Sequence, residues 1–180
     1  MEKKVRVNAS ILHNLKCFIQ LYFLTPMNVI YPPQKIKLSQ NQKSIFLAGS
    51  IDMGNAIDWQ QEIISSFKEN QNLCFFNPRR KDWDSSWEQT IENTHFNEQV
   101  TWELDALELA DLIVFYFAPT SKAPISLLEL GLFARNNNII VCCPIGYWRK
   151  GNVDIVCQRF GVKQVENLEE LIKEIQAVLG

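Results

Sequence analysis

The sequence predicts a single doubly wound α/β domain, in which helices cover both faces of a mainly parallel sheet. From residue 44 onward, short apolar runs of strand length alternate with longer amphipathic stretches. These stretches are long enough for crossover helices, which favours parallel pairing with right-handed connections. No repeat, low-complexity tract or linker divides the 180 residues. A domain of that length buries about 70% of its unfolded surface.

The first half of the chain supplies three predicted strands and two helices. A strand and turn are expected at 27–33, and a second strand at 45–48 ends at a glycine. A helix follows at 56–67, then a strand at 73–76, a tryptophan-rich loop at 79–89 and a helix at 96–109. Helical spacing puts Val100, Leu104 and Leu107 on one face of that helix.

The second half continues the alternation of strand and helix. The predicted elements are a strand at 111–117, a helix at 126–135, a strand at 139–143, a short helix near 153–159 and a terminal helix at about 167–178.

The first 26 residues form a separate segment. Their apolar stretch at 15–24 is interrupted by Lys16 and Gln20, no small-residue cleavage site follows, and the stretch is too short to span a bilayer. Met27 opens the first predicted strand. We therefore expect residues 1–26 to be a dispensable extension and residues 27–180 to form the domain.

Composition narrows the class of partner. A hydrophobic content of 47% with 21% charged residues is ordinary for a globular protein, and a net charge of −2 favours neither a nucleic-acid polymer nor a membrane surface. Five cysteines without a Cys-x-x-Cys pair, in apolar surroundings, indicate reduced thiols in a reducing compartment such as the cytoplasm. No zinc or haem site is expected, because the two histidines have no partner at ligand spacing.

Ligands of open α/β sheets bind outside the carboxyl ends of the strands, so the loops after Ala48, Phe76, Phe117 and Cys143 are the candidate site. After Ala48, Gly49 lets backbone amides approach a ligand, and Ser50 could hold an anion or a hydroxyl. The alternative is a tight strand-to-helix turn. Neither a dinucleotide fingerprint nor a phosphate-loop motif is present.

The loop after Phe76 combines indoles with carboxylates. Trp83 and Trp87 offer flat faces for a nucleobase or sugar, and Asp82 and Asp84 could accept hydrogen bonds from it. The alternative is a solvated loop whose tryptophans pack on the edge of the domain.

A lone acid, Glu129, lies inside the apolar run 125–133, where a charge is costly to bury. A second acid, Glu103, could point inward from the preceding helix and supply the carboxylate pair that glycosyl transfer needs. Ser126 and Glu129 also fit a capping box, which would give Glu129 a structural role. The positive end of the helix macrodipole would keep a carboxylate in the first turn ionised.

Several ordered segments together resemble the nucleoside 2-deoxyribosyltransferase superfamily, in its nucleoside 2-deoxyribosyltransferase-like branch. The resemblance covers about residues 28–165. The matching segments are 45–51 with Met53 and Gly54, 77–80 with 82–83 and 85–87, 99–103 with 110–111, 124–131 and 148–154.

The resemblance implies a Rossmann-like or flavodoxin-like domain that cleaves the N-glycosidic bond of 2′-deoxynucleosides through a covalent deoxyribosyl-enzyme. It puts the nucleophile at Glu129 and the second acid at Glu103, where relatives usually carry Asp. A tyrosine that family enzymes often carry on the first strand corresponds to Phe46 here, which has no hydroxyl.

The resemblance further implies a homo-oligomer that acts on a deoxynucleoside or deoxynucleotide and a free nucleobase without metal or organic cofactor. Asn152 or Asp154 would reach the neighbouring subunit's site. The expected substrate contacts are Gly49, Ser50, Met53, Asn77, Arg79, Asp82, Trp83, Asn152 and Asp154. Two alternatives to base exchange stay open: hydrolysis of deoxynucleosides or their 5′-monophosphates, and a catalytically silent nucleotide-binding module.

Overall fold

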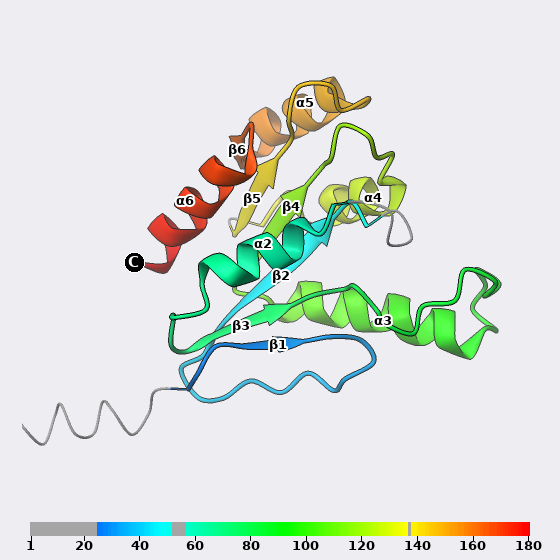
Figure 1. The fold of residues 1–180 in the computed structure, drawn as a ribbon. Coiled ribbons are helices and arrows are strands. Elements are labelled where there is room, and N and C mark those ends of the chain that lie inside the picture. The colour runs from blue at the N-terminus through cyan, green and yellow to red at the C-terminus, as the bar shows by residue number, and fades with distance from the viewer. Residues whose placement is uncertain (1–24, 52–56, 137) are drawn as a thin grey trace, which may run out of the picture.

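A computed structural model of the chain describes residues 25–51, 57–136 and 138–180. Its described part holds a six-stranded parallel sheet in the order β1-β3-β2-β4-β5-β6 (Figure 1). The strands are β1 (Asn28–Ile30), β2 (Lys43–Gly49), β3 (Leu73–Phe76), β4 (Leu112–Tyr116), β5 (Ile139–Cys142) and β6 (Lys163–Val165). The predicted single doubly wound α/β fold is confirmed.

The strand order reverses between β2 and β4. From β2 the chain passes outward to β3 and then crosses back to β4, so β2 and β4 are neighbours whose connections leave in opposite directions. The run β3-β2-β4-β5-β6 has the flavodoxin-like order, with β1 added at the edge beside β3. Such a reversal is where open α/β sheets bind ligands, at the carboxyl ends of the strands.

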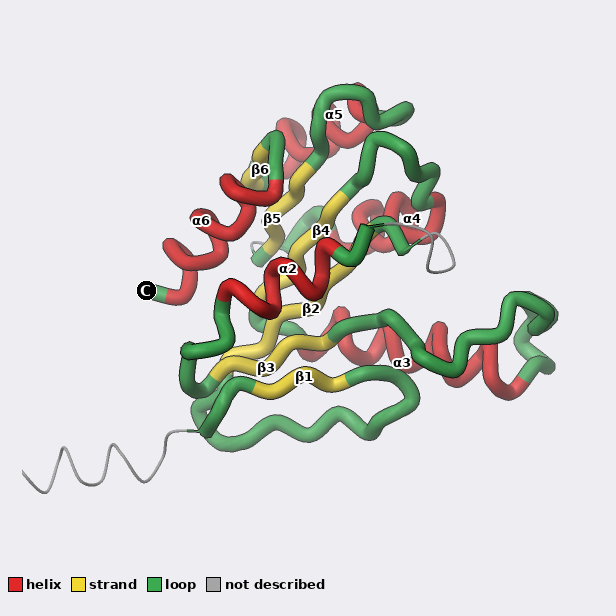
Figure 2. Tube along the Cα trace, in the orientation of Figure 1, coloured by secondary structure: helices red, strands yellow, loops and turns green. Residues whose placement is uncertain are grey.

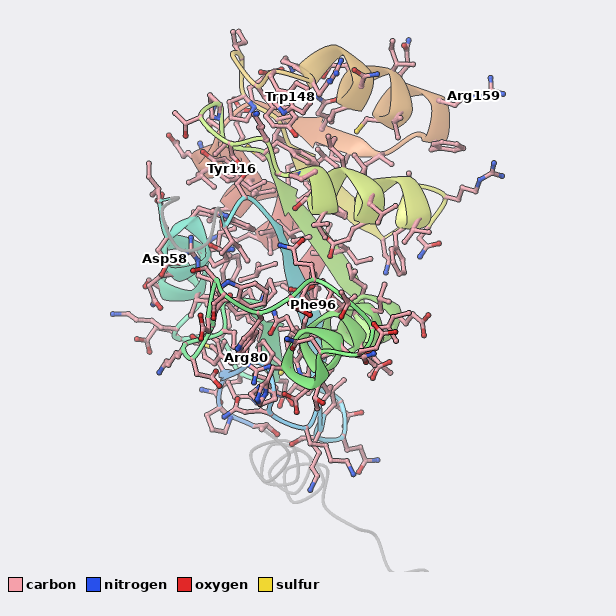
Figure 3. All side chains as sticks on the ribbon, turned by 90° about the vertical axis from the view of Figure 1, so that its right-hand side faces the viewer. Asp58, Arg80, Phe96, Tyr116, Trp148 and Arg159 are labelled. Atoms are coloured by element: carbon pink, nitrogen blue, oxygen red, sulfur yellow. The ribbon has the colours of Figure 1, made fainter. Side chains whose placement is uncertain are left out.

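Five helices form the two outer layers of the described structure. One face of the sheet is covered by α2 (Trp59–Ser66) and α6 (Leu168–Leu179), and the other by α3 (Thr94–Leu109), α4 (Pro124–Phe133) and α5 (Lys150–Phe160). Figure 2 shows the helices and the loops that join them to the strands, and the side view in Figure 3 shows α3, α4 and α5 together on one side.

The core lies between the sheet and these two helix layers. Along β2, Ile45 and Leu47 pack on the α2 and α6 side, whereas Phe46 and Ala48 pack on the α3 to α5 side. All four side chains are at most 1% exposed. Both faces of the strand are therefore apolar, which is why the parallel strands are continuous hydrophobic runs in the sequence. Burying each large side chain contributes about 1.5–3 kcal/mol.

The buried face of α3 agrees with the predicted apolar face at Leu107 but not at Leu104. The buried residues are Gln99, Trp102, Ala106 and Leu107, whereas Leu104 is 39% exposed. Trp102 sets the helix rotation because it is the largest apolar group available, and its Nε1 donates to the carbonyl of Gln34 at 2.8 Å. This rotation brings Gln99 and Glu103 to the inner side of the helix.

Two elements near the C-terminus also differ from the prediction. The edge strand β6 was not predicted, because it has three residues and only Val165 is buried, too few to show a period. The helix α5 begins at Lys150, earlier than the expected start near residue 153. Its Lys150 is held by Asp154 and Glu166, at 3.1 and 3.0 Å.

The start of the described chain is tied to β3. The backbone N of Thr25 donates to Asn72 Oδ1 and the backbone N of Asn72 donates to Thr25 O, both at 2.6 Å. Pro26 forms an antiparallel bridge with Gln71. Residues 1–24 lie outside the described residues, so the dispensability of residues 1–26 stays a prediction.

The described cysteines are buried and unpaired, as the sequence predicts: Cys74, Cys142, Cys143 and Cys157. Burial raises the pKa of Cys142 and Cys143 to about 12, which makes both thiols poor nucleophiles near neutral pH. Across the described residues, no group of three or more His, Cys, Asp or Glu side chains could hold a metal ion. No helix in this part of the chain is long and apolar enough to cross a membrane.

Candidate active site

The helix that carries Glu129 begins three residues earlier than a capping box would require. Pro124 occupies its first turn, where the missing N–H costs nothing, and Ala123 stands at the N-cap with φ 41° and no side-chain cap. Ser126 is therefore inside the helix and Glu129 is its sixth residue. The capping-box interpretation is wrong, because a cap hydrogen bond needs Ser126 at the helix start.

Glu129 is a buried acid on the inner face of α4, with 7% of its surface exposed. Burial, and then the negative charge of Glu103, raise the pKa of Glu129 to about 8. The expectation that the helix start keeps this carboxylate ionised is wrong for the free protein. Glu129 lies beyond the first turn, where the macrodipole has largely faded, and desolvation outweighs it.

Glu103 is the second acid of the site and is partly buried on α3. Burial raises the pKa of Glu103 to about 7, while a hydrogen bond from Gln99 opposes the rise. Gln99 Nε2 lies 2.8 Å from Glu103 Oε1. The helices α3 and α4 thus bring two carboxyl groups within electrostatic reach of each other, although 26 positions separate them in the sequence.

In the described chain, no lysine, arginine or histidine forms an ion pair with either acid. Two carboxyl groups in a low-dielectric site without a cation cannot both ionise readily near neutral pH. The pair therefore keeps about one proton between its members in that range. This state suits chemistry that needs one acid and one carboxylate.

The loop after β2 is fixed to the end of β4. Ser50 is fully buried; its N donates to Tyr116 O and its Oγ accepts from Ala118 N, both at 3.0 Å. Gly49 has φ +146°, and an added Cβ would lie 2.3 Å from Tyr116 O. Both residues thus hold β2 against β4 at the reversal of strand order. Substrate contacts of Gly49 and Ser50 stay predictions.

The loop after β3 is anchored to α2. Asn77 is buried, its N donates to Ile30 O at 3.0 Å, and its Oδ1 accepts from the N of Arg79 at 3.0 Å. The Arg79 guanidinium donates to Gln60 Oε1 at 2.8 Å and pairs with Asp58, the N-cap of α2, at 3.3 Å. Much of the hydrogen-bonding capacity of Arg79 therefore serves the fold.

The tryptophans of this loop pack on each other and on α3. Trp83 meets Trp87 edge-on with centroids 5.1 Å apart, and Trp87 stacks on His95 at 5.0 Å. The Arg80 guanidinium lies 5.0 Å from the Trp87 centroid and is held by Asp82 at 3.0 Å. These contacts favour the packed-loop alternative for Trp87, and they engage the Asp82 carboxylate with Arg80.

Asn152 and Asp154 lie on α5. Asp154 accepts from Lys150 and from Gln164, which ties α5 to β6. Asn152 is exposed and borders an apolar pocket of about 300 Å³ between α4 and α5. That pocket is lined by Leu127, Leu130, Gly131, Arg149, Asn152, Val153 and Val156, and not by Glu103 or Glu129.

Phe46 lies on the sheet face that α3 and α4 cover, with its ring centroid 6.5 Å from that of Trp102.

The loop before α4 is held by the loop after β5, since Lys122 O accepts from Tyr147 Oη at 2.8 Å and from Trp148 Nε1 at 3.0 Å.

Met53 lies outside the described residues. Sequence reasoning assigned no site role to Gln99, although its i, i+4 spacing to Glu103 was a usable signal.

The fold and the site together define a class of protein: a flavodoxin-like α/β domain with two carboxyl groups within electrostatic reach of each other, on helices that cover the same face of the sheet. A family model described as nucleoside 2-deoxyribosyltransferase-like matches residues 42–147, from the start of β2 to the loop after β5. The chain therefore belongs to the nucleoside 2-deoxyribosyltransferase-like family, as the resemblance predicted.

A solved structure gives independent support for the fold. The crystal structure of a conserved protein from Enterococcus faecalis V583 superposes with a TM-score of 0.54 at 12% sequence identity. The alignment covers 76% of this chain and 98% of that chain. None of the curated proteins compared with the chain by sequence matches it.

Proposed function

We propose that the protein cleaves the N-glycosidic bond of 2′-deoxynucleosides and transfers the deoxyribosyl group to an acceptor base. The observation that carries the proposal is the pair of acids formed by partly buried Glu103 and buried Glu129, whose pKa values rise to about 7 and about 8. Family membership supports nucleoside-type substrates and a transferase-like activity. No metal or organic cofactor is required by this chemistry.

In this mechanism, the Glu129 carboxylate attacks C1′ of the sugar and forms a covalent deoxyribosyl-enzyme. The C1′–N bond breaks and its electron pair stays with the base, which takes a proton from Glu103. A second base then attacks C1′ and releases Glu129. One proton shared by the two acids is sufficient for the first half of the reaction.

Hydrolysis of deoxynucleosides or their 5′-monophosphates is the second candidate. It differs only in that water, rather than a base, attacks the covalent intermediate. The first turn of α4 has no side-chain cap, and exposed Lys122 precedes it. Uncapped helix starts accept anions readily, which favours a 5′-phosphate as part of the substrate.

We also propose that the protein acts as a homo-oligomer. The outer face of α4 exposes Ile125, Leu128 and Leu132, each by about 60%. These side chains recur at helical spacing and form an apolar stripe without charges, a composition typical of obligate homodimer interfaces.

The buried, unpaired cysteines support a reducing location such as the cytoplasm.

The experiment is to incubate the purified protein with deoxynucleosides and deoxynucleoside 5′-monophosphates, with and without a free acceptor base. Formation of a new deoxynucleoside supports transfer, whereas release of free base alone supports hydrolysis. Retained binding without turnover would contradict both proposals and favour the catalytically silent module, for which Phe46 in place of the family's tyrosine is an argument.

Variants separate the two acids. Glu129→Gln should abolish turnover and remove a deoxyribosyl mass increment from the peptide that holds residue 129. Glu103→Gln should slow cleavage by about 10²–10⁴-fold, the usual contribution of a positioned acid. Glu108→Gln, an exposed acid on the same helix, is the matched control and should leave turnover unchanged. Normal turnover by Glu129→Gln would overturn the nucleophile assignment.

A further inference from the structure

Gln99 is a buried amide that contacts one acid of the pair and leaves half of its own hydrogen-bonding capacity unused. Only 4% of the residue is exposed. Its Nε2 donates to Glu103 Oε1 at 2.8 Å and to Pro78 O, just beyond the carboxyl end of β3, at 3.0 Å. Its Oε1 is buried and has no hydrogen-bond partner among the described residues.

The chemistry of its partners fixes the orientation of the Gln99 amide. The Pro78 carbonyl can only accept, so turning the amide would place Oε1 against another oxygen. Both Nε2 protons are therefore committed, one to Pro78 and one to Glu103. Leaving Oε1 without a donor costs about 1–3 kcal/mol. An unsatisfied buried group of this kind is a feature for which a functional explanation is expected.

This orientation has a direct consequence for Glu103. A carbonyl-type oxygen accepts from an amide N–H better than a carboxyl O–H oxygen does, so this contact favours Oε2 as the site of any proton on Glu103. The same hydrogen bond favours the charged form of Glu103. Glu129 accepts no hydrogen bond of this kind from any described residue, and its pKa is raised further by the charge of Glu103.

Other charged groups around the pair are held elsewhere or exposed. On the loop after β3, Arg80 is bound by Asp82 and by Glu98, whose exposed carboxylate lies at the start of α3. Lys122, before α4, is exposed. From β2, Phe46 packs on the sheet face that α3 and α4 cover and contributes no charge. Among the described residues, the hydrogen bond from Gln99 is thus the polar contact that Glu103 has and Glu129 lacks.

We propose that Gln99 is a positioning residue that makes Glu103 the carboxylate and Glu129 the protonated member of the pair in the free protein. The proposal rests on the proposed function for its catalytic consequence. Before attack, the proton leaves Glu129, which becomes the nucleophilic carboxylate, and reaches Glu103 Oε2. The departing base takes that proton together with the electrons of the broken C1′–N bond. Because Oε1 accepts from Gln99, the proton is presented preferentially from Oε2.

The test is a titration of the glutamate side chains by ¹³C NMR, with Glu103→Gln and Glu129→Gln assigning the two resonances. In the wild type, Glu103 should ionise before Glu129. Gln99→Met removes the donor at nearly constant volume and should reverse this order, because Glu103 then ionises at higher pH and no longer opposes the ionisation of Glu129. An unchanged order in Gln99→Met would overturn the proposal. The proposal would also be overturned if Glu129 ionised before Glu103 in the wild type. That measurement does not depend on the folding of any Gln99 variant.

Gln60→Met is a matched control. Gln60 is also a fully buried glutamine with an unpartnered amide atom among the described residues, and it anchors the same loop through Arg79. Among the described residues, no hydrogen bond joins Gln60 to either acid, so its replacement should leave both titrations unchanged. An equal reversal in Gln60→Met would overturn a specific role for Gln99.

A kinetic readout tests the catalytic consequence. Gln99→Met should lower kcat by about tenfold or more with a small effect on KM, because the contact acts on proton transfer and not on substrate binding. An effect confined to KM would overturn the role in catalysis. If the wild type fails to cleave any deoxynucleoside but the NMR order reverses as expected, the proposed function fails while the role of Gln99 in placing the proton stands.

Discussion

Ser44 and Asp111 form a reciprocal set of hydrogen bonds that joins the start of β2 to the start of β4. Asp111 Oδ2 accepts from Ser44 N at 2.8 Å and from Ser44 Oγ at 2.9 Å, and Asp111 N donates to Ser44 Oγ at 3.0 Å. These bonds lie at the amino ends of the two strands whose carboxyl ends meet at the candidate site. Asp111 thus has a structural explanation that requires no contact with substrate.

Replacing Asp111 with Ala should lower the free energy of unfolding by about 1.5–3 kcal/mol, the range for hydrogen bonds to a charged group. Ser44 is fully buried, so its hydroxyl and amide would lose this acceptor without access to water. Urea denaturation followed by circular dichroism measures the effect. Asp105→Ala, at an exposed acid on α3, should change stability by less than about 0.5 kcal/mol. Equal stability of the two variants would contradict the prediction.

The boundary of the domain can be tested with two truncated chains. A chain that begins at residue 27 loses both hydrogen bonds between Thr25 and Asn72, whereas one that begins at residue 25 retains these residues. We expect the shorter chain to be less stable by about 1–2 kcal/mol, from two hydrogen bonds of about 1 kcal/mol each. Thermal unfolding at matched concentration measures the difference. Identical stability would mean that Thr25 contributes nothing to the domain.

The apolar stripe on α4 gives a prediction for assembly. Leu128→Glu should convert the proposed oligomer to monomer, because a charge in the centre of an apolar interface is left without a partner. Light scattering after size-exclusion chromatography measures the mass. Val178→Glu, at an equally exposed apolar residue on α6, which covers the opposite face of the sheet, should leave the mass unchanged. A monomeric wild type would contradict the prediction.

Local sequence predicts the strands well and the helix starts less well. The strand Leu73–Phe76 agrees to the residue, because four consecutive buried apolar positions end at Asn77-Pro78. At α4, two start signals compete within three residues: a proline suited to the first turn, and a serine suited to a cap. The backbone of Ala123, at φ 41°, decides in favour of Pro124, and no pattern of apolar residues reveals that angle.

The candidate site depends on contacts between distant segments. Glu129 is unusual in the sequence because it is an acid within an apolar run. Its pairing with Glu103 follows from the rotation of α3, which Trp102 sets. The orientation of Gln99 depends on the carbonyl of Pro78, which is 21 positions away. The protonation state of Glu129 also depends on tertiary contacts. Its place near the helix start predicted an ionised carboxylate, whereas burial beside Glu103 raises its pKa.

The same pair makes stability depend on pH. Folded Glu103 and Glu129 have pKa values of about 7 and about 8, raised from 4.5. Between pH 4.5 and about 8, the folded state therefore binds more protons than the unfolded state. The free energy of unfolding falls with rising pH wherever this holds. The stabilisation should be complete below about pH 4.5 and lost as pH passes through 8.

Wild-type protein should accordingly lose several kcal/mol of stability between pH 5 and pH 8.5, since each pKa unit corresponds to about 1.4 kcal/mol. The double variant Glu103→Gln/Glu129→Gln should lose most of this slope and be more stable than the wild type at pH 8.5, because neither amide ionises. Urea denaturation across this range measures both. Acids with lowered pKa values, such as Asp82 and Glu169, change stability only at lower pH and do not mask the effect. A wild-type stability that rises from pH 5 to pH 8.5, or a slope that survives in the double variant, would show that the buried pair does not control it.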